Sequence, residues 1–174
     1  VELKETTSYL TAGAHKVRVD EMRNSNQKEG YTGTPYVEFK VSNKDGISYL
    51  KFSGVDGNTS ENAARVRTEI FKGFLHSTGA KSFNSLPTAC KEALGSTINV
   101  CLREREYWTT DKETGAPVVK TVVEYKFANP ENRAVVWNDR FNQALNPADQ
   151  AAYKAANDAF LMSQGNVQTD DMPF

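Results

Sequence analysis

Rings and positive charges recur together in three stretches of alternating sequence. Alternate residues of a β-strand point to the same side of a sheet, so residues two apart share a face. Cations can follow the phosphates of a single nucleic-acid strand while flat rings stack on its bases, and neither contact reads the base sequence. The residues concerned are Tyr36 and Lys40 in 35–42, Tyr49 and Lys51 in 47–55, and Arg103, Arg105 and Tyr107 in 97–108, with Trp108 at the loop that follows. We therefore expect a surface that binds single-stranded nucleic acid.

Two predicted loops extend this surface. The polar segment 24–33 supplies Lys28 and Tyr31, and the segment 109–117 supplies Lys112. Both segments are longer than a minimal hairpin turn, so each can reach over a ligand that lies on the strands.

Each of these residues also has a purely structural interpretation. Tyrosine is common in β-strands whether or not it binds anything. Arg103 and Arg105 alternate with Glu104 and Glu106, so cross-strand ion pairs can use up their charges. The coincidence of rings and cations on neighbouring strands is the stronger signal.

The end of the sequence is acidic and finishes in an aromatic carboxylate. Asp170 and Asp171 precede Met172, Pro173 and Phe174. The Phe174 ring can fill an apolar pocket while its α-carboxylate meets an arginine or lysine. The aspartates add attraction to a basic rim. We expect 166–174 to be a partner-binding tail, which could also lie in the DNA groove and compete with phosphate.

This tail resembles that of bacterial single-stranded DNA-binding proteins, which end in acidic residues, an apolar residue, Pro and Phe. In that family the tail docks replication and repair proteins. The resemblance implies that partner-binding residues here are Asp170, Asp171, Pro173 and Phe174. The usual bacterial protein has a long Gly/Gln/Pro-rich linker before its tail, whereas here an Ala-rich helix leads almost directly into it.

In this respect the chain is more similar to the single-stranded DNA-binding proteins of bacteriophages, which pair a divergent OB-fold with a short acidic, Phe-ended terminus. The resemblance covers roughly residues 10–128 by element order, and the tail. It implies a role in phage DNA replication, recombination or repair, in the cytoplasm of a bacterial host cell. The bacterial tetramer is not carried over.

The elements that position these residues follow from the hydrophobic pattern. Alternation predicts strands, with a hairpin turn at 43–46 in which Asp-Gly supplies positive φ angles. An apolar stripe of Ala63, Val66, Ile70 and Phe74 predicts a helix that ends near Gly79. The predicted strands are 14–24, 35–42, 47–55, 97–108 and 118–127, with a further short strand at 134–137 as one interpretation of an ambiguous segment.

Three further features complete the expected elements. A short helix is expected at 86–94, and Asn146 with Pro147 starts a helix that we expect to end by Gly165. The apolar strand faces predict that Phe39, Phe52 and Phe127 lie in the core.

The order of three strands, a helix and two strands is that of the OB-fold, a five-stranded Greek-key barrel. We therefore predict a mainly β chain with helices, of the α+β class. A plain five-stranded sheet with a packed helix would give the same order. In the OB-fold the ligand crosses strands two and three, between the loops that join strands one to two and four to five. The predicted domains are an OB-fold at 1–145, a helix at 146–165 and the tail at 166–174.

The composition limits which partners, membrane segments and metal sites can be expected. The net charge of this 174-residue chain is −1, and without the two tail aspartates it is +1, which still allows a local cationic groove. No apolar run approaches the roughly 18 residues of a membrane helix. Cys90 and Cys101 are expected to be reduced thiols, and His15 and His76 lie far apart, so no metal site is expected.

We find no sequence motif of an enzyme, such as a Walker loop, Gly-x-Ser-x-Gly or His-Glu-x-x-His. We expect no catalysis and no cofactor. The main prediction is sequence-nonspecific binding of single-stranded DNA, with partners recruited through the tail. The alternative is an OB-fold adaptor that joins proteins of a replication or recombination complex without contacting DNA. The helix after Asn146 is compatible with a homodimer contact or with a buttress for the barrel.

Overall fold

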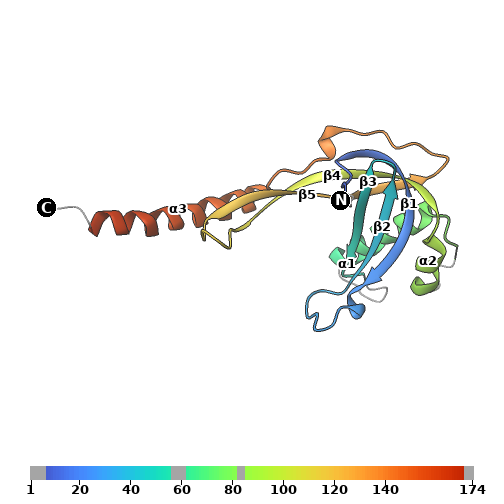
Figure 1. The fold of residues 1–174 in the computed structure, drawn as a ribbon, viewed down its shortest axis with the longest axis horizontal. Helices are drawn as coiled ribbons and strands as arrows, with labels where there is room; N and C mark the ends of the chain where they lie inside the picture. The colour runs from blue at the N-terminus through green and yellow to red at the C-terminus, as the bar shows by residue number, and fades with distance from the viewer. Residues whose placement is uncertain (1–6, 56–61, 82–84, 171–174) are drawn as a thin grey trace, which may run out of the picture. The chain divides into compact units, whose positions relative to one another are not determined.

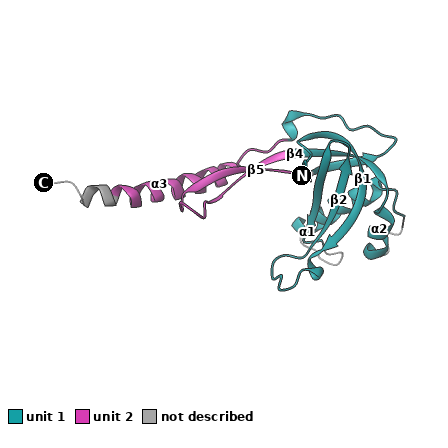
Figure 2. Cartoon of the chain, viewed as in Figure 1, with its two compact units in different colours: residues 1–103, 124–141 teal, residues 104–123, 142–174 magenta. Residues whose placement is uncertain are grey.

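The computed structural model describes residues 7–55, 62–81 and 85–170, with side chains as far as Gly165. It divides into two compact units (Figure 2). Unit 1 comprises Val1–Arg103 and Glu124–Phe141, and unit 2 comprises Glu104–Val123 and Asn142–Phe174. This division differs from the predicted domains, because the segment 104–123 groups with the C-terminal residues.

Five antiparallel strands form one sheet in the order β3-β2-β1-β4-β5, and the sheet does not close into a barrel. The prediction of an α+β chain with five strands is confirmed, and α1 and α2 lie between β3 and β4 in the sequence (Figure 1). The elements are β1 (Gly13–Asn24), β2 (Tyr36–Asn43), β3 (Gly46–Ser53), α1 (Asn62–Ser77), α2 (Leu86–Ala93), β4 (Thr97–Thr110), β5 (Pro117–Pro130) and α3 (Pro147–Asp170), with single 3-10 turns at Ser25–Gln27 and Asp139–Phe141.

The core of unit 1 is built around phenylalanine rings. Phe39 on β2 and Phe52 on β3 are buried, and both lie against Phe74 of α1, with ring centroids 4.8 and 5.0 Å away. Leucine, valine and isoleucine from β1, β2, β3 and β4 surround these rings. The predicted core positions of Phe39 and Phe52 are confirmed. Phe127 is only half-buried and packs on Phe141, at 5.6 Å, so its assignment to the core was wrong.

Only part of the predicted stripe of α1 is buried: Phe74 lies in the core, but other positions of the stripe do not. Val66 and Ile70 expose 54% and 45% of their surface, whereas Phe71 and Thr68 are buried. The predicted phase is therefore off by about one residue. Thr68 can face the core because its hydroxyl donates to the Ala64 carbonyl at 2.9 Å, which satisfies the buried polar group.

The β2–β3 hairpin turns at the predicted place with a different local geometry. Asp45 does not adopt a positive φ, and no described residue other than glycine does. The Asp45 N–H instead donates to the Asn43 side chain at 2.8 Å. Gly46 does have a positive φ, and a Cβ there would lie 2.5 Å from the Ser8 carbonyl oxygen. The Ile47 N–H donates to that same oxygen, and this hydrogen bond holds the Ser8 carbonyl close to the turn. Only glycine therefore fits at position 46.

Two predicted boundaries in the C-terminal part are corrected. The segment 134–137 is not a strand. The Asn99 side-chain amide donates hydrogen bonds of 2.9–3.0 Å to the carbonyls just before this segment, those of Pro130, Glu131 and Arg133. These bonds hold an irregular connection in place without the backbone hydrogen bonds of a strand pair.

The last helix, α3, continues past Gly165 to Asp170, because one glycine costs a helix only about 1 kcal/mol. Its start is as predicted, with the Asn146 side chain accepting from Asp149 N–H at 2.8 Å. No helix among the described residues has the length and apolar character needed to cross a membrane.

Candidate nucleic-acid interface

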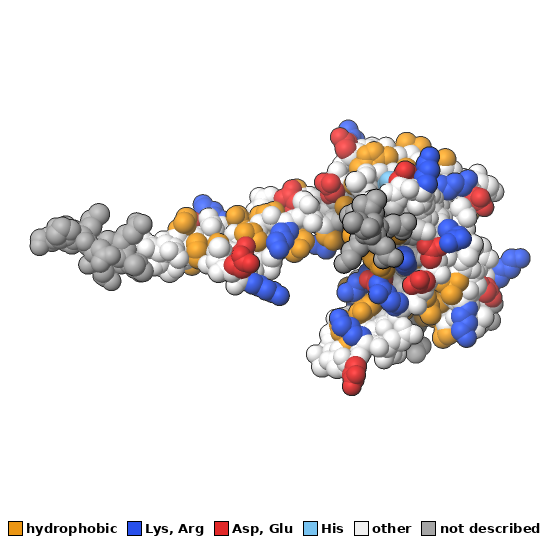
Figure 3. Space-filling view, in the orientation of Figure 1, with side chains coloured by type: hydrophobic (Ala, Val, Ile, Leu, Met, Phe, Trp, Pro, Cys, Tyr) orange, Lys and Arg blue, Asp and Glu red, His pale blue; other side chains and the backbone are white. Residues whose placement is uncertain are grey.

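The outward side of β1, β2 and β3 carries the predicted rings and cations of unit 1. In the β2–β3 register Lys40 lies opposite Tyr49, and Glu38 lies opposite Lys51. All four side chains face away from Phe39 and Leu50, which alternate with them and are buried. On the face of unit 1 that Figure 3 shows, basic and acidic side chains are interspersed.

A bulge in β1 adds a cation to this side. The pairing of β1 with β2 shifts by one residue between Val19 and Glu21. Since side chains alternate, a shift of one residue moves every following side chain to the other side of the sheet. Arg23 consequently lies opposite Glu38 instead of the inward-facing Val37. The sequence analysis missed Arg23, although Met22 is out of phase with Val19 across two polar residues, and this change of phase is the signal that could have revealed the bulge.

Each of three tyrosines on this side has a cation over its ring. Arg23 Cζ lies 4.7 Å from the Tyr49 ring centroid, and Lys51 Nζ lies 4.3 Å from that of Tyr36. The third pair belongs to the loop between β1 and β2, where Lys28 Nζ lies 5.7 Å from the Tyr31 ring centroid. We call these six residues the tyrosine face. Lys40, also predicted, lies beside it, opposite Tyr49.

The loop between β1 and β2 is held in a defined position. The Tyr31 hydroxyl donates a hydrogen bond to the Thr34 carbonyl at 2.8 Å. The rings of Tyr31 and Tyr36 pack in a T-shaped arrangement, with their centroids 5.3 Å apart. The buried Ser25 hydroxyl accepts from Tyr36 N–H at 3.1 Å. Two tyrosines that are five residues apart therefore form one aromatic surface.

Acidic side chains moderate the charge of the tyrosine face. Glu38 accepts a salt bridge from Arg23 at 2.8 Å, so this guanidinium contacts a carboxylate and a ring at once. Partial burial raises the pKa of Asp20, but hydrogen bonds from Ser42 and Arg18 and the positive charges of Arg18 and Lys40 outweigh it, and the net pKa lies below its usual value. Both carboxylates therefore reduce the attraction of this side for phosphate.

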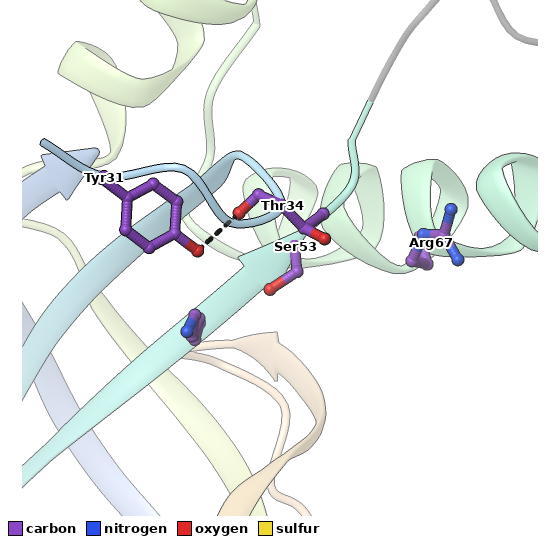
Figure 4. A pocket seen from close by; sticks show the side chains of 5 residues that line it. Tyr31, Thr34, Ser53 and Arg67 are labelled. Atoms are coloured by element: carbon purple, nitrogen blue, oxygen red, sulfur yellow. Dashed lines mark hydrogen bonds between the residues drawn. The ribbon is translucent and has the colours of Figure 1, made fainter. Parts of the chain in front are cut away.

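A polar hollow lies at one end of the tyrosine face. Its volume is about 490 Å³, and it lies between the loop after β1, the end of β3 and the helix α1 (Figure 4). The lining residues are Tyr31, Thr34, Lys51, Ser53 and Arg67. Sequence reasoning missed Thr34, Ser53 and Arg67. No pattern in the sequence places a residue of α1 beside the end of β3.

The predicted residues of β4 fall into two groups. Arg103 belongs to unit 1 and is half-buried in an ion pair with Glu124 of β5, with N–O distances of 2.9 and 3.0 Å. This is the cross-strand pairing that the sequence left open for the arginines.

The other predicted residues of this region belong to unit 2. Arg105 Cζ lies 6.0 Å from the ring centroid of Tyr107, and Trp108 packs edge-on against Tyr153 of α3 at 6.3 Å. Lys112 is exposed in the turn between β4 and β5. In that turn, hydrogen bonds from the N–H groups of Glu113 and Thr114 lower the pKa of Asp111. The contacts that build the tyrosine face include none of these residues.

The structure describes none of the four predicted partner-binding side chains of the tail. Asp170 is the last residue of α3, and its side chain is not described. Asp171, Pro173 and Phe174 lie outside the described residues.

Comparison with known proteins gives no match. No protein-family model, curated protein or solved structure matches this chain. Within the described parts of the chain, no group of three or more His, Cys, Asp and Glu side chains could hold a metal ion. The tyrosine face and the sequence of the tail are therefore the features that point to a function.

Proposed function

We propose that this protein binds single-stranded DNA without sequence preference, and that the bases stack on the tyrosine face. One observation carries the proposal: Tyr31, Tyr36 and Tyr49 each have a lysine or arginine within 6 Å of the ring centroid, on one side of β1–β3. A stacked base contributes about 1–3 kcal/mol, whereas an exposed cation–π contact contributes about 0.5–1 kcal/mol. A base can therefore replace the cation on a ring, and the displaced cation can meet the neighbouring phosphate.

The proposed frame for this binding is an OB-type fold. The helices α1 and α2 lie between β3 and β4 in the chain, and β1 pairs with both β2 and β4. The sheet is open, but the ring of Phe52 on β3 lies 5.1 Å from that of Tyr125 on β5, so the two edge strands curl toward each other. In OB-folds the ligand crosses the surface of strands two and three. The tyrosine face occupies β2, β3, the adjoining part of β1 and the loop between β1 and β2.

The tail supplies the second part of the proposal. By resemblance, the acidic Phe-ended terminus recruits replication, recombination or repair proteins to DNA that the tyrosine face protects. A bacteriophage protein that acts in the cytoplasm of its bacterial host fits this description.

Fluorescence anisotropy tests the proposal. Labelled oligo-dT, oligo-dA and oligo-dC of one length, and a duplex of that length, are titrated with the full chain across a salt series. We expect similar affinities for the three single strands, weaker duplex binding, and an affinity that falls as salt rises.

No binding of any single strand at low salt would contradict the proposal. The adaptor without DNA contact would then be the better account of the tail. A strong preference for one base would contradict stacking as the main contact, because every base offers an aromatic face.

A further inference from the structure

The hollow beside the tyrosine face has the chemistry of an anion site. Its lining contains two cations, Lys51 and Arg67, and three hydroxyl-bearing residues, Tyr31, Thr34 and Ser53. None of these five lining residues is acidic. In Figure 4 the Tyr31 hydroxyl points to the Thr34 carbonyl, and Arg67 lies on the opposite side, beyond Ser53. A phosphate group, which accepts several charge-assisted hydrogen bonds, suits this arrangement.

Backbone contacts hold the walls of the hollow together. Gly54 N–H donates to the Pro35 carbonyl at 2.9 Å, which joins the end of β3 to the loop after β1. Arg67 Nε of α1 donates to the Gly54 carbonyl at 3.4 Å. Three separate segments thus meet at Gly54.

Glycine at position 54 makes room for the guanidinium. Gly54 has a φ of +63°, and a Cβ there would lie 2.8 Å from Arg67 Nε. Any other residue would be strained in this backbone conformation and would push Arg67 away. The guanidinium therefore already has one contact at the edge of the hollow before any ligand arrives.

We propose that this hollow binds one internal phosphodiester of the strand whose bases stack on the tyrosine face. The inference rests on the proposed function and names a subsite of that surface. Lys51 connects the two parts, since it lines the hollow and its Nζ also lies 4.3 Å from the Tyr36 ring centroid. A base on Tyr36 would release Lys51 toward the phosphate, where Arg67 supplies the second charge and Ser53 a hydroxyl donor.

The test compares two arginines of the same helix. Arg65 is also exposed on α1, but two positions along a helix is a rotation of about 200°, and it does not line the hollow. Arg67→Gln and Arg65→Gln make the same change in charge. Both variants and the unaltered chain are titrated with oligo-dT across a salt series, after thermal melting has shown that they remain folded.

We expect Arg67→Gln to weaken binding about two- to fivefold at low salt, as an exposed ion pair predicts. The slope of log K against log salt should become shallower by about 0.7, the value for one phosphate contact in a single strand. Arg65→Gln should leave both quantities as in the unaltered chain. Equal slopes for all three proteins would overturn the inference.

The same titrations separate this inference from the proposed function. If the unaltered chain binds oligo-dT and only the Arg67 effect is missing, the subsite is wrong and the tyrosine face stands. If the unaltered chain does not bind, both proposals fall. Oligo-dT with a 5′-hydroxyl and oligo-dT with a 5′-phosphate should show the same Arg67 effect. An effect confined to the 5′-phosphorylated strand would instead assign the hollow to a terminal phosphate.

Discussion

Tyr49 shows how one ring can serve both the free and the bound protein. In the free protein the Arg23 guanidinium lies over the ring and Lys40 lies opposite across the strand pair. The guanidinium covers the ring position that a base would take, so stacking must displace Arg23. The displaced charge and Lys40 both stay close enough to meet the phosphates beside that base.

Replacing Tyr49 tests the stacking contact. Tyr49→Ala should weaken oligo-dT binding by about 1–2 kcal/mol, since the stacked base is lost and Arg23 gains nothing in its place. Tyr49→Phe should bind like the unaltered chain, because the ring remains. Anisotropy titrations measure both. Equal weakening by the two variants would show that the hydroxyl, not the ring, makes the contact.

Glu38 opposes binding in the same account. Its carboxylate holds Arg23 at 2.8 Å and lies opposite Lys51. Glu38→Gln should therefore raise the affinity for oligo-dT about two- to fivefold at low salt and steepen the salt dependence. Glu69→Gln makes the same charge change at an exposed position of α1 and should have no such effect. A loss of affinity in Glu38→Gln would mean that Glu38 positions Arg23 for binding.

Tyr125 makes stability depend on pH at the alkaline end. Burial raises the pKa of its phenol well above the usual value, and a hydrogen bond with the Ala128 backbone offsets only part of this. Above about pH 10 the unfolded chain therefore loses this proton before the folded chain does, so the free energy of unfolding falls as pH rises.

Tyr125→Phe removes this proton, and its unfolding free energy should fall less steeply between about pH 10 and 11. Urea denaturation at several pH values measures the slope. Tyr9→Phe, at a side chain that is 67% exposed, is the control and should keep the slope of the unaltered chain. Identical slopes for all three proteins would contradict the assignment.

At the scale of elements, the sequence predicts the strands well because a half-buried sheet requires alternation. The alternation of 35–42 and 47–55 places Tyr36, Tyr49 and Lys51 on one side, as found. The bulge after Val19 leaves only a weak mark on the alternation, the single out-of-phase Met22, so the sequence analysis did not place Arg23 on that side. The contact of Arg67 with Gly54 joins a helix to a strand end, and no local pattern contains that information.

The helix α1 shows how an apolar pattern can mislead about phase. Val66 and Ile70 are apolar but exposed, and Thr68 is polar but buried. A stripe counted on residue type alone therefore selects the wrong side. The hydrogen bond that allows Thr68 inside depends on its side-chain rotamer, which the sequence does not state.

Two neighbouring residues of α1 test its orientation. Phe71→Ala should destabilise the fold by about 3–5 kcal/mol, because a buried ring that contacts Phe52 is lost. Ile70→Ala should cost less than about 1 kcal/mol, since Ile70 is 45% exposed. Thermal or urea unfolding measures both. A larger loss for Ile70→Ala would support the stripe expected from the sequence.

At the scale of the whole chain, the charge is nearly balanced, and the arrangement of charges decides what the surface can bind. The net charge is −1, and two of the acidic residues stand in the C-terminal tail. A neutral chain attracts DNA weakly at long range, so binding relies on the local contacts of the tyrosine face. An acidic tail can then compete for the same cations.

Truncation after Gln168 tests this competition. This truncation removes 169–174 and with it the two negative charges of Asp170 and Asp171, while the new terminus at Gln168 carries an α-carboxylate of its own. We expect the truncated chain to bind oligo-dT more tightly than the full chain at low salt, with the difference shrinking as salt rises. Unchanged affinity would restrict the tail to partner binding.

The most direct test of the central claim locates the DNA on the protein. Amide resonances of the full, ¹⁵N-labelled chain are followed by NMR while oligo-dT is added. We predict that the largest shifts lie along β2, β3 and the loop after β1, at Tyr31, Tyr36, Tyr49 and Lys51. Shifts confined to unit 2, around Arg105 and Trp108, would contradict a binding site on the tyrosine face, and so would the absence of any shift.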